Sequence, residues 1–341
     1  MKRFPLLLAV VASALAAMSS QAADTRADFL NLIKYRRVSL SPSVEEWPAT
    51  NGLRQFHFSF AADKAQRVTG VLMKEKSSRG RRPVVIALHG TGGSKGNLLA
   101  LCRKLATNGF VAVAIDGRYH GERRGPGKGT TEYQDAIIGA WRDAREHPLY
   151  YDTVWDVIRL MDYLKTRKDV DAKRIGLIGI SKGGIEAYLA AAVDQRIAVV
   201  VPCIGVQSFR WALENNAWQA RIGTIPAAFE AAAKAAGVTE PNVAFAKTFY
   251  DRVVPGIYGE FDGPAMLPLI APRPLLVING DSDRRTPRPG LKECTDAAQN
   301  AYRAAGAEDR FAVRIQENTA HQVTPDSERA AIEWFVRWLK P

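Results

Sequence analysis

Gly179-Ile180-Ser181-Lys182-Gly183 is the stretch of this 341-residue chain that decides its fold. It follows the apolar run Arg174–Ile178, which predicts a buried strand, and precedes the run Ile185–Ala192, which predicts a helix. A serine between two glycines at a strand-to-helix turn is typical of a nucleophile elbow, where the tight turn strains the serine backbone. The glycines leave the room that such a turn needs. We therefore expect the Ser181 hydroxyl to project above the edge of the sheet as a nucleophile.

A serine nucleophile needs a base, usually a histidine that is oriented by a carboxylate. The chain has five histidines. His321 is the best candidate, because it lies between the predicted strand Phe311–Ile315 and the last predicted helix, after the serine in sequence. His120 competes with it, since it also follows a predicted strand, Val111–Ile115, but it precedes the serine. We expect His321 to be the base.

The acid is expected in the loop after the next-to-last strand, here Pro274–Asn279. Two aspartates, Asp281 and Asp283, lie in that loop. Asp281 is nearest to the strand, where an aspartate often binds the amide N–H groups of the turn. Asp283 lies further along, where a side chain reaches the histidine loop. We favour Asp283 as the acid and keep Asp281 as the alternative.

Two backbone N–H groups are needed to bind the negative oxygen that forms during acyl transfer. The first is expected from Lys182, at the positive N-terminal end of the helix after the serine. The second is expected from Thr91, in the glycine-rich segment His89–Ser94 that follows the predicted strand Val84–Leu88. Phosphate binding is the other use of such a segment, but neither common nucleotide-binding pattern is complete there.

With these motifs in this order, the chain resembles the α/β-hydrolase superfamily, and more closely its branch of dienelactone hydrolases, acetyl xylan esterases and prolyl-oligopeptidase-like enzymes. The segments that carry the resemblance are His89–Ser94, Ala114–Arg123, Gly179–Gly184 and Gly280–Asp283. The resemblance spans about residues 53–340 and implies an α/β-hydrolase fold, a mostly parallel sheet flanked by helices with a helical cap insertion. Dienelactone hydrolases proper use a cysteine nucleophile, so Ser181 in this position favours ester hydrolysis.

The alternation of strands and helices from Val84 onward predicts a parallel sheet independently of that resemblance. Before it, the alternating runs Arg54–Phe60 and Arg67–Met73 predict an antiparallel pair of strands, and residues 24–50 predict an irregular lead-in. Helices are expected near Lys95–Thr107, Thr153–Thr166, Lys182–Ala192 and Ser327–Leu339.

The substrate site is expected to draw on two further parts of the chain. About residues 205–271, after the predicted strand Ile197–Cys203, form the cap insertion, whose aromatic residues should mostly pack among its helices. Some should line the pocket, and Trp211 is the candidate. His120 is a second candidate for substrate binding. The arginines expected near a substrate carboxylate are Arg118, Arg123 and Arg284, of which Arg118 is the preferred one.

The N-terminus has the pattern of a secretory signal peptide. Lys2 and Arg3 precede an apolar stretch from Phe4 to about Met18, and Ser20-Gln21-Ala22 supplies small residues for cleavage. The stretch is short for a bilayer span, so no stable membrane insertion is expected. We predict a signal peptide over residues 1–22 and a periplasmic or secreted protein, with an uncleaved interfacial anchor as the alternative.

The net charge of +12 suggests acidic partners, but the basic residues are scattered without interleaved aromatic residues, so no nucleic-acid partner is expected. The three cysteines lack the spacing of a metal site, and we expect neither a metal nor a cofactor. Cys102 and Cys203 are predicted to be core residues, although export would permit one disulfide. The oligomeric state stays open.

Taken together, these features predict an exported serine carboxylesterase, with residues 23–341 as one hydrolase domain. Its substrate would be a short-chain, acetyl-type ester of a small molecule or carbohydrate, cleaved through an acyl-enzyme. A prolyl-oligopeptidase-like serine peptidase is the first alternative, disfavoured because the short segment before the sheet leaves no room for a propeller domain. A non-catalytic binding protein is the second, disfavoured because every triad position is filled.

Overall fold

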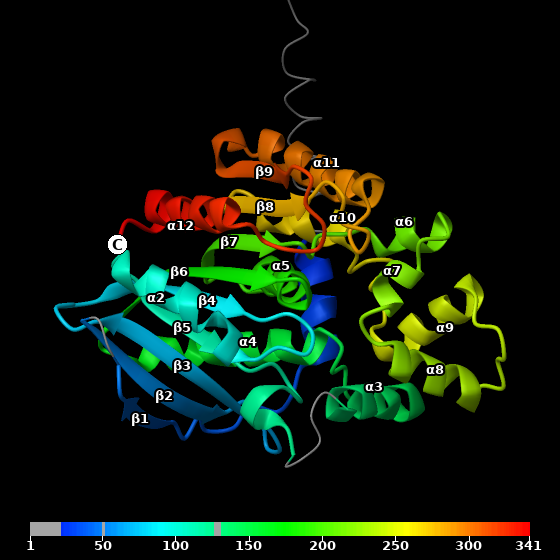
Figure 1. Ribbon diagram of the computed structural model, residues 1–341, viewed down its shortest axis with the longest axis horizontal. Coiled ribbons are helices and arrows are strands. Elements are labelled where there is room, and N and C mark those ends of the chain that lie inside the picture. Colours follow the sequence, from blue (N-terminus) through cyan, green and yellow to red (C-terminus); the bar gives the residue numbers. More distant parts are fainter. Residues whose placement is uncertain (1–21, 50–51, 126–130) are drawn as a thin grey trace, which may run out of the picture.

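The computed structural model describes residues 22–49, 52–125 and 131–341. In this part of the chain a nine-stranded sheet has the order β1-β2-β3-β5-β4-β6-β7-β8-β9 (Figure 1). The strands are β1 (Ser43–Trp47), β2 (Leu53–Ala61), β3 (Arg67–Glu75), β4 (Arg82–Leu88), β5 (Val111–Ile115), β6 (Val170–Ile180), β7 (Ile197–Cys203), β8 (Leu275–Gly280) and β9 (Phe311–Gln316). The pairs β1–β2, β2–β3 and β3–β5 are antiparallel and the others are parallel. The predicted α/β-hydrolase sheet is thereby confirmed.

The sheet is buried on both faces, because successive side chains of a strand point to opposite sides. In β4, Val84 and Ile86 belong to one core cluster, whereas Val85 and Ala87 belong to the other. Helices α2 (Leu99–Thr107) and α12 (Pro325–Leu339) cover the second cluster. The first cluster is covered by α3 (Thr131–Asp143), α4 (Tyr151–Thr166), α5 (Lys182–Val193) and α11 (Arg288–Ala304). Three short 3-10 helices are η1 (Lys95–Leu98), η2 (Gly121–Arg123) and η4 (Glu308–Arg310). Among the described residues, no helix is both long and apolar enough to cross a bilayer.

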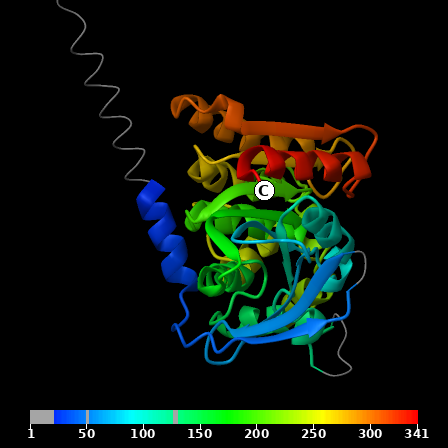
Figure 2. The ribbon, with the colours of Figure 1, turned by 90° about the vertical axis from the view of Figure 1, so that its left-hand side faces the viewer.

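The lead-in is more ordered than the sequence predicts. Residues 22–33 form a helix, and β1 pairs with β2 within the segment expected to be irregular. The helix lies along the outside of the core (Figure 2), where Phe29 is fully buried and its ring meets those of Tyr151 and Phe261 edge-on. Arg26 also donates hydrogen bonds to the carbonyls of Ala192 and Leu269. These long-range contacts order a segment whose local sequence has weak periodicity. The predicted signal peptide lies outside the described residues, except for Ala22.

The segment between β7 and β8 is helical. Its elements are α6 (Phe209–Glu214), α7 (Gln219–Ile222), α8 (Pro226–Ala235), α9 (Val243–Val253), α10 (Gly263–Met266) and η3 (Leu267–Ile270). Most of its aromatic side chains pack on one another, as Phe229 does with Phe245 and Phe249 at centroid distances of 5.1 and 5.2 Å. These rings form the interior of the segment, which stands beside the sheet at the end of α3 (Figure 1).

All three cysteines are buried and unpaired. Cys102 and Cys203 lie in the core cluster under α2 and α12, as expected, and Cys294 lies in the other cluster on α11. Burial raises the pKa of the Cys102 thiol to about 12. These thiols therefore stay protonated and act as small apolar side chains.

Candidate active site

Ser181 lies at the turn between β6 and α5 with φ 58° and ψ −115°, a conformation that is rare for a residue with a side chain. The flanking glycines explain how the turn closes. A Cβ on Gly179 would lie 1.9 Å from the carbonyl oxygen of Gly183, and a Cβ on Gly183 would lie 2.4 Å from that of Leu88. Any larger residue at either position would force the turn open, so the local sequence and the strained serine belong together.

Three side chains from three loops form a continuous line of hydrogen bonds. The Ser181 Oγ and His321 Nε2 atoms are 2.7 Å apart, and His321 Nδ1 lies 2.7 Å from Asp283 Oδ2. Asp283 follows β8, and His321 follows β9, the next strand in the sheet. Because parallel strands end at the same edge, the topology brings these loops to the turn after β6. The geometry is that of a serine nucleophile, a base and an orienting acid.

Asp283 is held by groups that the sequence did not single out. The Thr286 hydroxyl donates to Asp283 Oδ2 over 2.7 Å, and the Arg285 N–H donates to Oδ1 over 2.8 Å. Thr286 in turn accepts a hydrogen bond from the amide of the buried Asn279. Burial raises the pKa of Asp283, but the hydrogen bonds from His321 and Thr286 outweigh it and hold the pKa below its usual value. The carboxyl is therefore ionised when it faces the imidazole.

Asp281 has a different position. Its carboxylate accepts hydrogen bonds from the N–H groups of Asn318 and Thr319 and from the Ser282 hydroxyl. The hydrogen bonds from Ser282, Asn318 and Thr319 lower the pKa of Asp281. Asp281 thus ties the acid loop to the histidine loop, and the structure brings Asp283, not Asp281, to the imidazole.

The other candidate base, His120, is enclosed. Its Nδ1 lies 2.7 Å from the Arg118 carbonyl oxygen, its Nε2 is buried without a partner, and its ring packs against those of His89 and Tyr133. Burial and the nearby Lys182 ammonium lower the pKa of His120 to about 2 and that of His89 to about 4. Both rings are neutral parts of the wall behind the serine, and His89 Nε2 accepts a hydrogen bond from the Gly117 N–H.

The expected oxyanion donors lie beside the serine. Thr91, Ser181, Lys182 and His321 line one pocket. Within the described residues, the backbone N–H groups of Thr91 and Lys182 have no hydrogen-bond partner. The Lys182 side chain points elsewhere, since its ammonium is buried in an ion pair with Glu186. Both amides are therefore free to bind an oxygen at this point of the pocket.

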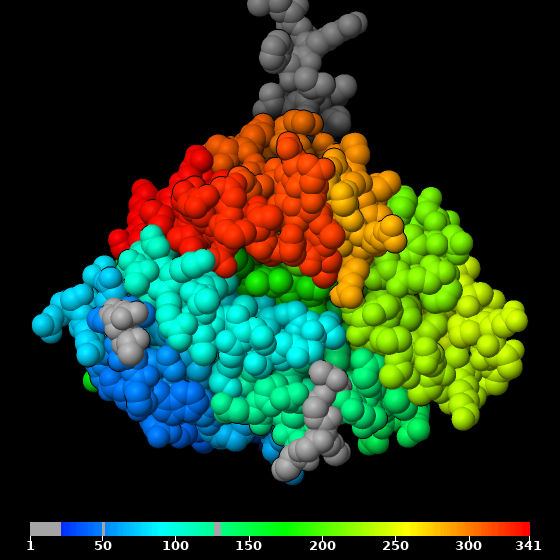
Figure 3. Space-filling model, in the orientation of Figure 1, coloured from blue at the N-terminus to red at the C-terminus, as the bar shows by residue number. Residues whose placement is uncertain are grey.

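The remaining walls of the pocket come from three regions. They are Tyr150, Ile185, Ile204, Arg221, Thr224 and Arg285. Figure 3 shows a hollow bordered by cyan and orange-red surface with green atoms at its base, the colours of the segments around residues 90, 320 and 180. Sequence reasoning missed Arg221, a single arginine on the short helix α7, where no motif marks it. It also missed Tyr150, whose φ of 75° is visible only in the structure.

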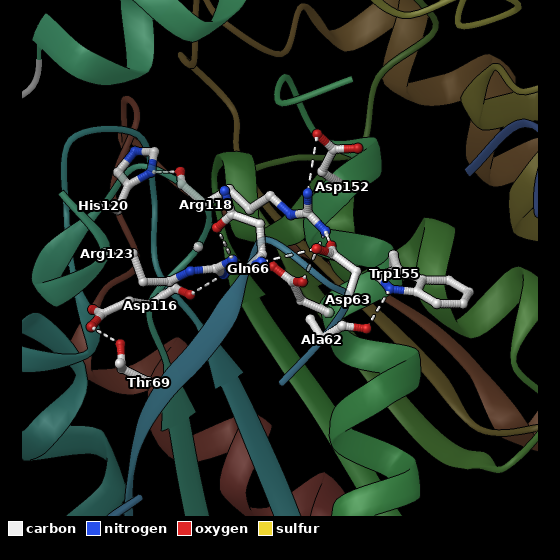
Figure 4. Close-up of polar contacts among 12 residues, drawn as sticks. Ala62, Asp63, Gln66, Thr69, Asp116, Arg118, His120, Arg123, Asp152 and Trp155 are labelled. Atoms are coloured by element: carbon white, nitrogen blue, oxygen red, sulfur yellow. Dashed lines mark hydrogen bonds and ion pairs between the residues drawn. The ribbon is translucent and has the colours of Figure 1, made fainter. Parts of the chain in front are cut away.

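The structure does not bring Arg118, His120 or Trp211 to this pocket. The Arg118 guanidinium is fully buried and turned toward the carboxylates of Asp63 and Asp152 (Figure 4), with Asp63 Oδ2 at 2.7 Å. Arg123 pairs with Asp156 at 2.6 Å. The cluster of buried ion pairs around these two arginines supports the loop after β5 from beneath.

Trp211 and Arg284 also lie apart from the pocket lining. Trp211 is on α6, with its ring next to Gly290 of α11, where a Cβ would be 3.1 Å from Trp211 Cε3. Arg284 is exposed to solvent. The charged residues that do line the pocket are Arg221 and Arg285, together with the catalytic candidates.

Solved structures with the same fold include two esterases. The acetyl xylan esterase from Paenibacillus sp. R4 is 21% identical, with a TM-score of 0.65 and 92% of each chain covered. Acetyl xylan esterase 1 from Thermoanaerobacterium sp. JW/SL YS485 is 18% identical, with a TM-score of 0.68 and 93% of each chain covered. At this level of identity the likeness shows a shared fold.

Proteins with related sequences include a hydrolase and a methylesterase. YtaP of Bacillus subtilis (strain 168), a protein named as a hydrolase, is 24% identical over 287 residues, covering 80% of this chain and 84% of the relative. A 4-O-methyl-glucuronoyl methylesterase of Neurospora crassa is 26% identical over 194 residues, covering 54% of this chain and 46% of the relative. This chain therefore spans less than half of that longer enzyme.

The family described as acetyl xylan esterase (AXE1) matches residues 30–213, which is more than half of the chain and includes the serine elbow and both oxyanion candidates. The resemblance stated from the motifs is confirmed by this match and by the shared fold. The chain belongs to the acetyl xylan esterase (AXE1) family of the α/β-hydrolase superfamily, and it is a hydrolase that acts on carboxylic esters.

Proposed function

We propose that this protein is an exported serine carboxylesterase that removes short, acetyl-type acyl groups from small-molecule or carbohydrate alcohols. The observation that carries the proposal is the line of hydrogen bonds from Asp283 through His321 to Ser181, which ends in a pocket with two free amide N–H groups. Membership of the AXE1 family supports an acetyl group as the acyl part.

In the proposed reaction, Ser181 Oγ attacks the ester carbonyl while His321 Nε2 takes the hydroxyl proton. The Asp283 carboxylate accepts the hydrogen bond from Nδ1 and stabilises the imidazolium. The Thr91 and Lys182 N–H groups bind the negative oxygen of the tetrahedral intermediate. His321 then gives its proton to the leaving alcohol, which breaks the ester C–O bond and leaves an acyl-enzyme. Water, deprotonated by the same imidazole, releases the acid and restores the serine.

The size of the pocket supports a short acyl chain. The space enclosed beside Ser181 is only about that of one water molecule. Its walls combine the apolar side chains of Ile185 and Ile204 with the polar side chains of Thr224, Arg221 and Arg285. Any acyl group must displace part of these walls, and a two-carbon group needs the smallest displacement.

The experiment that tests the proposal is a comparison of 4-nitrophenyl acetate, butyrate and palmitate with a proline-containing peptide amide. We expect kcat/KM to be highest for acetate or butyrate, and Ser181→Ala to lower it by about 10⁴-fold or more with the fold intact by circular dichroism. Palmitate preference, or peptide cleavage that rivals acetate, would reject the substrate class. A folded and fully active Ser181→Ala protein would reject the serine mechanism.

The acid is tested by a pair of variants in one loop. Asp283→Asn should lower kcat by about 10³–10⁴-fold, because an amide favours the wrong tautomer of His321. Asp281→Asn should lower it by less than about tenfold, because Asp281 binds backbone N–H groups and does not touch the imidazole. The two proteins are compared at equal fractions folded. A larger loss of kcat in Asp281→Asn would reverse the assignment.

We further propose that residues 23–341 form the hydrolase domain and that about residues 205–271 act as its cap. The support is that Arg221 and Thr224, on or next to α7, line the pocket. Replacing Thr224 by a larger residue such as Trp should then lower kcat/KM for butyrate more than for acetate, since the added bulk narrows the acyl space. Equal losses for both esters would argue against a role of this segment at the acyl group.

Export is proposed from the N-terminal pattern, with the mature chain beginning at Ala23. That cleavage would retain the helix of residues 22–33 almost whole, including the buried Phe29 and Ile33. Intact-mass analysis of protein secreted by a bacterial host measures the new N-terminus. Retention of residues 1–22 in the secreted or periplasmic fraction would contradict the proposal.

A further inference from the structure

Arg221 differs from the other buried cations of the described chain. The buried lysines and arginines are Lys95, Arg118, Arg159, Lys182 and Arg221. Each of the first four forms an ion pair with a carboxylate, whereas no hydrogen bond or ion pair of the Arg221 side chain is found within the described residues. Arg221 is only 6% exposed, and its Nε is fully buried without a partner. An arginine that is removed from water without a counter-ion costs free energy unless a ligand supplies the charge.

The surroundings of Arg221 are apolar or neutral. Its guanidinium lies 5.6 Å from the ring centre of Phe209, and its charge acts on the phenols of Tyr150, Tyr188 and Tyr250. A cation above an aromatic ring gains some attraction, but less than a carboxylate would give. The aromatic contacts hold the guanidinium in place and leave its charge unbalanced.

The nearby carboxylate of Asp262 is already engaged by backbone N–H groups. Asp262 acts on the same Tyr188 phenol as Arg221, but it accepts hydrogen bonds from the N–H groups of Phe209, Arg210 and Gly263 and forms no ion pair with Arg221. Those N–H groups lie at the starts of α6 and α10, so Asp262 joins two helices. It does not neutralise the guanidinium.

Arg221 lines the same pocket as Ser181 and His321. Arg285 lines it from the opposite loop, two residues after the proposed acid, and Arg285 also forms no ion pair in the described structure. Tyr150 adds a phenol to the same wall. One buried arginine, one exposed arginine and one hydroxyl donor thus converge on the place where a substrate would sit.

We propose that Arg221, assisted by Arg285, binds a carboxylate of the substrate, so that the enzyme prefers esters carrying a second, ionised carboxyl group. The inference rests on the proposed function. One buried guanidinium balances one negative charge, which favours a carboxylate over a phosphate dianion, and the planar fork of arginine matches the two carboxylate oxygens. The carboxylate belongs either to the acyl part, as in a half-ester of a dicarboxylic acid, or to the alcohol, as in an acetylated sugar acid.

Two matched pairs of substrates separate these sources. The acyl arm compares mono(4-nitrophenyl) succinate with its methyl ester, and the alcohol arm compares 4-acetoxybenzoate with methyl 4-acetoxybenzoate. Within each pair a carboxylate is replaced by its methyl ester, which removes the charge and adds one methyl group. The ratio of the two kcat/KM values, after subtraction of spontaneous hydrolysis, measures the preference for the carboxylate. We expect the wild-type enzyme to prefer the acid in one arm, which identifies the part of the substrate that carries it.

Three variants test which arginine is responsible. Arg221→Gln should lower that ratio about tenfold or more, as expected when a charged hydrogen bond is lost, and Arg221→Lys should restore part of it. Arg285→Gln should lower the ratio about threefold, because an exposed cation is screened by solvent. Arg284→Gln is the matched control, since Arg284 is the exposed neighbour that does not line the pocket, and its ratio should equal that of the wild type.

A binding measurement separates failure of this inference from failure of the proposed function. Succinate and benzoate are titrated by calorimetry into Ser181→Ala and into the double variant Ser181→Ala/Arg221→Gln. Weaker binding in the double variant would support the carboxylate site even if no ester were turned over. Ser181-dependent turnover of the neutral esters, with equal ratios in wild type and Arg221→Gln and no Arg221-dependent binding, would overturn the inference and leave the esterase intact.

Discussion

Arg118 and Arg221 are both buried arginines, and they differ in what surrounds them. Arg118 is enclosed by Asp63, Asp152 and Asp156, with its nearest carboxylate oxygen at 2.7 Å, whereas Arg221 lies over the ring of Phe209 and forms no ion pair with any described residue. Burial alone would lower the pKa of Arg118, but the charges of Asp156 and Asp152 raise it above its usual value. Carboxylates of the protein balance the charge of Arg118, although its Nε and Nη1 atoms make no hydrogen bond to the described residues, whereas a ligand carboxylate is proposed to balance the charge of Arg221.

The partners of a buried arginine indicate whether it stabilises the fold or binds a ligand, and they do so better than its position in the sequence. Arg118 follows a strand at the active edge and was expected to bind substrate, yet its donors are directed into the protein (Figure 4). Arg221 carries no motif, yet it lines the pocket. A buried cation therefore has to be judged by its partners, because the cost of desolvation must be offset by something.

The largest effect is expected when the complete cluster is broken. Arg118→Met leaves the buried carboxylates of Asp63 and Asp152 without their cation, while Asp156 keeps Arg123, and should lower the free energy of unfolding by about 3–5 kcal/mol. Chemical denaturation at pH 7 measures this. Arg145→Met, which removes an exposed ion pair with Asp143, is the control and should cost at most about 1 kcal/mol. A loss below about 1 kcal/mol in Arg118→Met would show that this cluster of ion pairs does not stabilise the fold.

An intermediate effect is expected from Asp262, and it tests whether Arg221 is truly unpaired. Burial raises the pKa of Asp262 from its ordinary 3.8 to about 6, although hydrogen bonds from Arg210, Phe209 and Gly263 oppose the rise. Because the folded state then holds this proton more tightly than the unfolded state, stability should fall as pH rises from about 4 to about 6.

The measurement is the free energy of unfolding of wild type minus that of Asp262→Asn, which should decrease by about 2 kcal/mol between pH 4 and pH 7. Asp296→Asn, at an exposed position paired with Lys292, should show no such change. An increase with pH would mean that Asp262 is stabilised as an anion. Arg221 would then already have its counter-ion, and the comparison with Arg118 would fail.

The smallest effect on stability is expected at Arg221 itself. Arg221→Met removes a cation–π contact of about 0.5–1 kcal/mol but also removes an unpaired buried charge, so the free energy of unfolding should stay within about 1 kcal/mol of wild type or rise. The same denaturation experiment measures it next to Arg118→Met. A decrease of more than about 3 kcal/mol in the free energy of unfolding would show that Arg221, like Arg118, stabilises the fold.

The fold was predictable because its signals are local. Alternating buried runs and the glycines of the elbow gave β4 to β9 and the helix after Ser181 to within a few residues. The helix of residues 22–33 and strand β1 were missed, because they are ordered by contacts such as Phe29 on Tyr151 and by pairing with β2. Such distant partners leave no periodic pattern in the segment itself.

The sequence by itself determined the identity and order of Ser181, Asp283 and His321 as candidates, because strand order requires these loops to meet at one edge of the sheet. Only the tertiary structure separated Asp283 from Asp281, since both lie in one short loop and differ in whether they reach an imidazole or a backbone N–H. Only the tertiary structure, likewise, distinguished Arg118 from Arg221. Whether a buried charge is balanced depends on side chains that are distant in sequence, and the carboxylates around Arg118 come from two separate segments of the chain, the loop with Asp63 and helix α4 with Asp152 and Asp156.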